Sequence, residues 1–206
     1  MTRVAICGVA RTPIGKFRGS LSNLSAVDLG IRAVKELLHR CNIDPETGII
    51  DELLFGQVLQ AGAGQAPARQ VALGAGLPNT IAATTINKVC GSSLKAVMMA
   101  ANSIRAGQTK VVIAGGMESM TNAPKFEKRN GDEKEMVSTM VHDGLWDVYN
   151  DLHMGNTGEI IANECNISRE KMDSFAARSQ HLAAQAEQSG WFDWERFEMP
   201  ELNCDE

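Results

Sequence analysis

Cys90 is the residue of this chain with the clearest potential for chemistry. The five cysteines stand singly, at positions 7, 41, 90, 165 and 204, and the four histidines are equally dispersed. An odd number of cysteines without a Cys-x-x-Cys spacing argues against a disulfide framework or a zinc site, because each needs paired or clustered ligands. The sequence therefore leaves two interpretations, which are one nucleophilic cysteine or five buried thiols.

The residues around Cys90 predict a turn from a strand into a helix. Residues 83–89 are rich in β-branched side chains and predict a strand, and residues 90–106 predict a helix closed by Gly107. A cysteine in the first turn of a helix lies beside unpaired N–H groups and the positive end of the helix dipole, which favour the nucleophilic thiolate. The N–H of Cys90 could also stabilise an oxyanion on an attached acyl group. The alternative is a cysteine that only packs beneath the helix, since free cysteine is often buried.

Strands and helices alternate along the first 116 residues. Ser25 with Asp28 three positions later has the pattern of a capping box, and apolar residues at 27, 31, 34 and 38 then share one helix face. The predicted strands are 3–10, 53–59, 83–89 and 110–116, and further helices begin near Pro67 and at Cys90. Leu94, Val97 and Met98 are expected to pack the last of these helices against the sheet. This alternation predicts an α/β fold with a mostly parallel sheet and helices on both faces.

The chain changes character after Gly116. Glu118 follows the Gly-Gly pair at a strand end, where a structural hydrogen bond is a simpler interpretation than catalysis. Residues 122–147 are polar and charged and are interrupted by Pro124 and Gly131, so an excursion from the sheet is expected. Two helical stretches follow, within residues 156–166 and 168–190.

Charge and hydropathy argue against several classes of protein. The net charge is −5 and no basic run occurs, so nucleic-acid binding is not expected. No apolar run approaches the ~18 residues of a membrane span, so no membrane partner is expected. The N-terminal residues have the pattern of neither a signal peptide nor a transit peptide, and a cytoplasmic protein is expected.

Six segments resemble the thiolase family, in the family's order. Residues 87–97, Asn-Lys-Val-Cys-Gly-Ser-Ser-Leu-Lys-Ala-Val, resemble the segment in which the thiolase cysteine becomes acylated. The other matching segments are residues 10–22, 64–73, 111–124, 143–159 and 167–180. The resemblance implies a thiolase-like N-terminal α/β domain at 1–120 and a helical loop domain at 121–206.

The resemblance also implies a function and a set of site residues. Cys90 matches the acyl-accepting nucleophile, and Leu145, His153 and Met154 match loop-domain positions that border the coenzyme A and acyl pocket. The His-Met pair is the form associated with short-chain, acetoacetyl-type thiolases. Without the resemblance, His153 would be interpreted as a structural or surface histidine. The implied reaction is the reversible condensation of two acetyl-CoA molecules, or thiolysis of a 3-ketoacyl-CoA, with coenzyme A thioesters as substrates and no metal or redox cofactor.

The second half of a thiolase carries three further motifs that these 206 residues do not contain. They are a Gly-His-Pro histidine, a Cys-x-Gly cysteine that acts as acid and base, and an Asn-Glu-Ala-Phe segment. The sequence is therefore expected to need a C-terminal thiolase half or a homo-oligomer, whether it is a truncated chain, a fragment gene or a subunit of a split enzyme. Two other functions stay open: a ketoacyl-synthase-type condensing enzyme, and a non-catalytic acyl-CoA-binding or interaction fragment.

Overall fold

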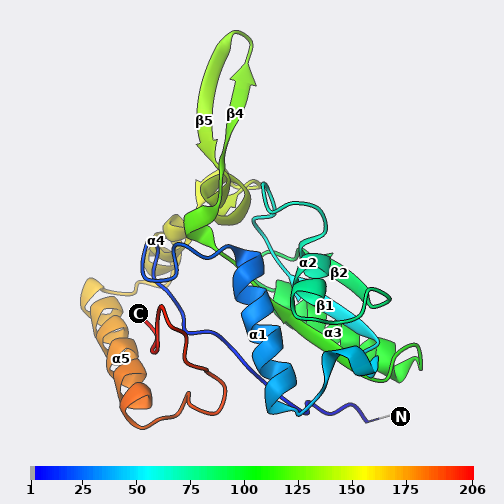
Figure 1. Ribbon diagram of the computed structural model, residues 1–206. Helices are drawn as coiled ribbons and strands as arrows, with labels where there is room; N and C mark the ends of the chain where they lie inside the picture. The colour runs from blue at the N-terminus through cyan, green and yellow to red at the C-terminus, as the bar shows by residue number, and fades with distance from the viewer. Residues whose placement is uncertain (1–2) are drawn as a thin grey trace.

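A three-stranded parallel sheet forms the centre of the protein, in a computed structural model that describes residues 3–206 (Figure 1). The strands are β1 (Glu52–Gly56), β2 (Ala82–Ile86) and β3 (Val112–Gly116), and their order across the sheet is β2-β1-β3. Gly56, at the end of β1, is in register with Ile86 and Gly116 at the ends of its two neighbours. The carboxyl ends of all three strands therefore meet at one edge, and the prediction of a parallel α/β sheet is confirmed.

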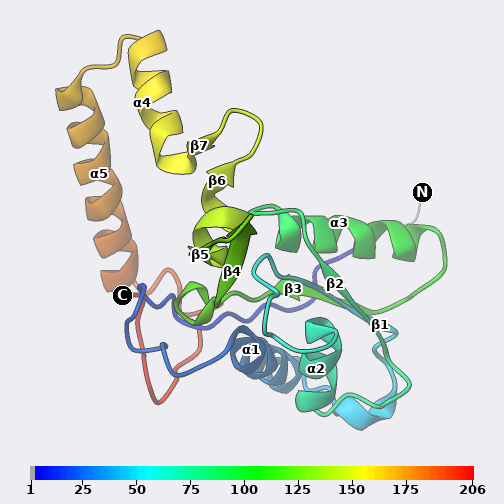
Figure 2. The same cartoon turned by 90° about the horizontal axis from the view of Figure 1, so that it is seen from above.

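Helices cover both faces of this sheet (Figure 2). Helices α1 (Ala26–Arg40) and α2 (Pro67–Gly74) pack on one face against Leu53 and Phe55, and α3 (Ser92–Arg105) packs on the other face against Leu54. Successive side chains of β1 point to opposite faces, so a single buried strand contributes to both cores. Pro67 begins α2, as predicted.

The local signals of α1 are confirmed. The Ser25 side chain accepts a hydrogen bond from the Asp28 N–H, and the Asp28 carboxylate accepts one from the Ser25 N–H. Val34 and Leu38 are buried on the face that the sequence predicted. Gly30 lets this face approach its neighbours closely, because a Cβ there would lie 2.8 Å from a methyl carbon of Val71.

The predicted strand at residues 3–10 is wrong. These residues form no strand, and Ile6 is 78% exposed. Apolar and β-branched composition favours a strand locally, but a strand also needs a neighbour that accepts and donates its backbone hydrogen bonds. Within residues 3–206, no segment adds this run to the sheet.

The predicted buried face of α3 is also wrong. Leu94 is 68% exposed, Met98 is 51% exposed and Val97 is 37% exposed. The side chains that face the sheet are small, namely Ser92, Ala96 and Ala100. Both sides of this helix carry apolar residues. The side with small residues faces the sheet, because it allows the helix to lie close to the strands.

The excursion after Gly116 contains a hairpin that projects from the body of the molecule (Figure 1). Strands β4 (Lys125–Asn130) and β5 (Glu133–Ser138) pair antiparallel, and Gly131 takes the left-handed φ of +64° in the turn between them. A π-helical segment (Met140–Leu145) and a short ladder of β6 (Trp146–Asp147) with β7 (Leu152–His153) follow. Helices α4 (Met154–Glu164) and α5 (Arg169–Gln188) confirm the two predicted helical stretches, and short 3-10 turns lie at Pro45–Thr47 and Met120–Asn122.

The chain after α5 returns to the N-terminal segment. Arg11 binds Glu195 at 2.6 Å and binds Asp205 through two hydrogen bonds of 2.8 and 2.9 Å. Burial alone would raise the pKa of the Asp205 carboxyl, but hydrogen bonds from Arg11 and from the Ile14 N–H bring it below its ordinary value. The end of the segment assigned to the loop domain therefore packs on the α/β domain.

The cysteines and the longer helices bear on the class of protein. All five cysteines are free thiols, and Cys90 is among those that are exposed. No helix within residues 3–206 combines the length and the apolar character needed to cross a membrane.

Candidate active site

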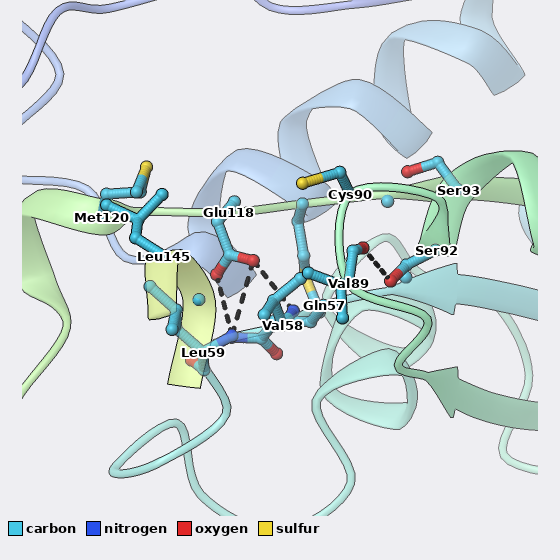
Figure 3. Close-up of a pocket in the computed structure, with 14 residues that line it drawn as sticks. Gln57, Val58, Leu59, Val89, Cys90, Ser92, Ser93, Glu118, Met120 and Leu145 are labelled. Atoms are coloured by element: carbon cyan, nitrogen blue, oxygen red, sulfur yellow. Dashed lines mark hydrogen bonds between the residues drawn. The ribbon is translucent and has the colours of Figure 1, made fainter. Parts of the chain in front are cut away.

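A cavity of about 450 Å³ opens at the sheet edge where the parallel strands end (Figure 3). Its walls come from the end of β1 and the loop after it (56–59), the end of β3 and the residues after it (116–118), the turn before α3 with the first residues of that helix, and the π-helical segment. The carboxyl edge of a parallel sheet is the usual place for a ligand in open α/β folds. The lining is mainly apolar, with Cys90 and Glu118 as its reactive groups.

Cys90 lies in the turn before α3, with its sulfur directed to the side of the cavity that Glu118 and Leu145 form (Figure 3). The helix begins at Ser92 with Gly91 as its N-cap, two residues later than predicted. Cys90 therefore precedes the first helical turn. The turn that carries its sulfur leads directly into the N-terminus of α3.

Val89 holds an uncommon backbone conformation directly before Cys90. Its φ is +46°, in the left-handed region that costs a residue with a side chain roughly 1–2 kcal/mol and that β-branched residues rarely adopt. The Val89 N–H donates to Asn87 Oδ1 at 2.9 Å. The Ser92 hydroxyl donates to the Val89 carbonyl at 2.6 Å (Figure 3). The tight turn brings Cys90 to the cavity wall.

Two glycines allow this turn to lie against the sheet edge. A Cβ at Gly56 would lie 2.6 Å from the Ser92 Cβ and 2.8 Å from the Ser92 carbonyl carbon, and a Cβ at Gly116 would collide with the Ser93 hydroxyl. Real Cβ atoms do not approach backbone so closely, and therefore any larger residue at either strand end would push the start of α3 outward.

Glu118 forms the wall of the cavity opposite the turn. Its carboxylate accepts hydrogen bonds from the backbone N–H groups of Val58 at 2.8 Å and Leu59 at 3.3 Å (Figure 3). Burial raises the pKa of this carboxyl, against the lowering effect of those N–H groups. The hydrogen-bonding role predicted for Glu118 is confirmed, and it fixes the loop that follows β1.

The structure brings together two of the four predicted site residues. Leu145 lines the cavity with Cys90. His153 lies outside the lining, where its Nδ1 accepts a hydrogen bond from the Gly155 N–H at 3.0 Å and caps α4. Met154 begins α4 and is 40% exposed. The roles predicted for all four residues in binding or catalysis stay predictions, and His153 has a structural task in this chain.

The loop at residues 57–59 and Met120 also line the cavity, although no sequence motif identified them. Met120 follows the end of the predicted strand 110–116. Residues 57–59 were assigned to the predicted strand 53–59, but β1 ends earlier, at Gly56, and leaves them in a loop. None of the lining residues is a histidine, and within residues 3–206 no group of three or more His, Cys, Asp or Glu side chains is placed to hold a metal ion.

Comparisons with known proteins point to one family. The family model described as thiolase, N-terminal domain, matches residues 4–199. Acetyl-CoA acetyltransferase 2 of Arabidopsis thaliana is 51% identical over 197 residues, and acetyl-CoA acetyltransferase of Cupriavidus necator is 51% identical over 201 residues. These matches cover 93% and 95% of this chain, but 48% and 50% of the relatives, so the chain spans about half the length of the curated relatives it matches.

A solved structure agrees with the sequence matches. The Acat5 thiolase of Ascaris suum, determined in complex with coenzyme A, is similar to this chain with a TM-score of 0.90 and 36% sequence identity. The similarity covers 97% of this chain and 53% of that chain. The arrangement of sheet, helices and excursion described above is therefore shared with a coenzyme A-binding relative.

Proposed function

Because the chain belongs to the thiolase family, we propose that it is the nucleophile-bearing half of an acetyl-CoA acetyltransferase, with Cys90 as the acyl carrier. The observation that carries this proposal is the position of Cys90. Its sulfur enters an apolar cavity at the carboxyl edge of a parallel sheet, beside the N-terminus of α3. The cavity has the size and the apolar lining suited to a small acyl group.

The proposed chemistry transfers an acyl group between sulfur atoms. The Cys90 thiolate attacks the thioester carbonyl, its C–S bond forms, and the bond to the coenzyme A sulfur breaks; the departing thiolate takes up a proton. The α-carbon of a second acetyl-CoA, after losing a proton to a base, then attacks the Cys90 thioester and releases the Cys90 thiolate with acetoacetyl-CoA. In thiolysis these steps reverse, and free coenzyme A removes the acyl group from Cys90.

The second step needs a base that the described chain does not place at the cavity. No histidine is among the lining residues, and the lining carboxylate, Glu118, is engaged by two backbone N–H groups. An effective base must reach the proton that it removes. The proposed enzyme therefore takes its base from a C-terminal thiolase half, on the same polypeptide or on another.

The exposed face of α3 supports the same partner. Leu94, Val97, Met98 and the neighbouring Val89 form an apolar surface next to the cavity, with exposed fractions of 37–68%. Contiguous apolar surface on a soluble protein commonly marks an interaction site. A second half covering this face would also close the cavity and bring its own side chains close to Cys90.

Acyl transfer can be tested on the 206-residue chain alone. Incubation with acetyl-CoA and peptide mass spectrometry should show one acetyl group on the Cys90 peptide. The Cys90→Ser variant should lose it, and Cys204→Ser, which removes another exposed cysteine, should keep it. Acetylation spread equally over the exposed cysteines would contradict the proposal and would favour a non-catalytic acyl-CoA-binding fragment, for which the absence of a lining histidine is the supporting observation.

Full turnover is the second test. Acetoacetyl-CoA thiolysis should be undetectable with the chain alone and should appear when a C-terminal thiolase half is added. Sedimentation of the mixture would show whether the added half binds, or whether a second copy of this chain already occupies the exposed face. Turnover by the monomer at ~1 per second or faster would mean that the chain holds its own base.

A further inference from the structure

We propose that Ser92 and Asn87 are positioning residues, which hold Val89 in its left-handed conformation and thereby set the direction of the Cys90 side chain. The inference rests on the proposed role of Cys90 as acyl acceptor and adds the residues that orient its side chain. Neither residue needs to touch the substrate for this task. Both act through the backbone of the turn.

Each of the three peptide groups between residues 87 and 90 is bound by one of these two side chains. The Lys88 N–H donates to Ser92 Oγ at 2.8 Å, and the Ser92 hydroxyl donates to the Val89 carbonyl at 2.6 Å. Between them, the Val89 N–H donates to Asn87 Oδ1 at 2.9 Å. The backbone also closes this turn, because the Gly91 N–H donates to the Lys88 carbonyl at 3.0 Å and the Ser92 N–H donates to the Val89 carbonyl at 3.1 Å. The two side chains add one hydrogen bond to each peptide group of this path.

Packing does not explain the conformation of Val89. Its side chain is 49% exposed, so burial of the isopropyl group contributes little that would offset the unfavourable φ of +46°. Residues persist in such conformations only when the surroundings over-determine them. The hydrogen bonds that the Ser92 and Asn87 side chains make with the turn, together with its two backbone hydrogen bonds, are the surroundings that do so here.

Ser92 lines the cavity but is largely shielded from solvent. It is 5% exposed, and its Cβ faces Gly56 at the end of β1. The serine is therefore clamped between the sheet edge and the turn. Ser92 therefore links the end of β1 to Val89, the residue that precedes Cys90.

The test compares Ser92→Ala with Ser103→Ala in the 206-residue chain. Ser103 lies on the same helix, far from the turn, and also loses one side-chain hydrogen bond, the one donated by Thr109 at 2.9 Å. Acetyl transfer from acetyl-CoA to Cys90 should slow at least tenfold in Ser92→Ala and stay within twofold of the parent in Ser103→Ala. Amide hydrogen exchange at Lys88, whose N–H loses its acceptor, should rise only in Ser92→Ala.

A rescue variant separates positioning from general damage. Glycine adopts a positive φ without the Cβ penalty. The double variant Val89→Gly/Ser92→Ala should therefore transfer acetyl to Cys90 at least threefold faster than Ser92→Ala. A purely structural role for Ser92 would give no such recovery. Asn87 is exposed, so Asn87→Ala should fold and should slow the transfer in the same direction even if Ser92→Ala does not fold. Transfer within twofold of the parent in both Ser92→Ala and Asn87→Ala would overturn the inference.

A second reagent keeps this test independent of the proposed function. If acetyl-CoA does not acylate the parent chain, the proposed function fails, and iodoacetamide then decides the positioning. The alkylation rate of Cys90 divided by that of Cys204 in the same molecule should fall at least threefold in Ser92→Ala and recover with Val89→Gly. An unchanged ratio would show that the two side chains do not aim the sulfur.

Discussion

Two leucines, one in the buried strand β1 and one on the outer face of α3, give a sharp prediction about stability. Leu53 in β1 is fully buried beneath α1 and α2, whereas Leu94 on α3 is 68% exposed. The change to alanine removes the same three carbon atoms at both sites. Apart from a small difference in helix propensity, any difference in the free energy of unfolding therefore reports burial.

The exposed fractions set the magnitudes. Three buried carbon groups at about 0.8 kcal/mol each give about 2.4 kcal/mol, and the cavity left behind brings Leu53→Ala to ~3–4 kcal/mol. At Leu94 only about a third of the side chain is buried, which scales the same transfer energy to ~0.8 kcal/mol without a cavity term. Alanine is also the better helix former by a few tenths of a kcal/mol. Leu94→Ala is therefore expected to cost about 0.5 kcal/mol.

Urea denaturation followed by far-ultraviolet circular dichroism measures both variants, at a protein concentration where sedimentation shows no self-association. Equal m-values would validate the comparison of midpoints. A loss above 2 kcal/mol for Leu94→Ala in the isolated chain would refute the assignment of the outer face. With a C-terminal half added, the same variant should weaken association, because the leucine then enters an interface.

Three further predictions concern the cavity and the returning tail. Gly56→Ala should lower the free energy of unfolding by ~1–3 kcal/mol, because its methyl group would overlap Ser92. Gly158→Ala in α4 has open space around it and should raise that free energy by up to ~1 kcal/mol. Urea midpoints measure both variants, and equal effects would contradict the close approach at Gly56. The lowered pKa of Asp205 stabilises the fold above ~3.9, the value for an unfolded chain, and this contribution is lost as the pH falls through the folded pKa. Asp205→Asn should therefore destabilise fully at pH 7 and progressively less as the pH is lowered below ~3.9, and a pH-independent difference would contradict the ion pair. The raised pKa of Glu118 has the opposite sign: its contribution is full below ~4.3 and is lost as the pH rises through the folded value, so the stability of the parent relative to Glu118→Gln should fall between pH 4 and pH 7.

Local signals in the sequence were sufficient for much of the fold. The capping box at Ser25 and the helical spacing of apolar residues located α1, because both involve neighbours within one turn. The strand at 3–10 failed because pairing depends on a distant partner, which composition does not reveal. The hairpin was missed although Asn130-Gly131 is a strong turn signal, since its charged strands have no buried face.

The site was only partly predictable for a similar reason. The family segment located Cys90, and Leu145 reached the same cavity. His153 and Met154 lie outside the lining, because the short β6–β7 ladder and the start of α4 carry them away from it. The hydrogen bonds between Glu118 and the loop after β1 join residues 60 positions apart, and no local pattern encodes such a contact.

Helix α3 joins two tasks that need opposite surfaces. Its inner face consists of small residues, Ser92, Ala96 and Ala100, which let its first turn approach the glycines at the strand ends. That approach holds the turn before Cys90, so the same packing that stabilises the sheet also aims the sulfur. The outer face carries Leu94 and Met98 beside the cavity and contributes little to the stability of this chain. The proposed C-terminal half would cover these large apolar residues, and from this face it would reach Cys90 on the side where residues 3–206 place no base.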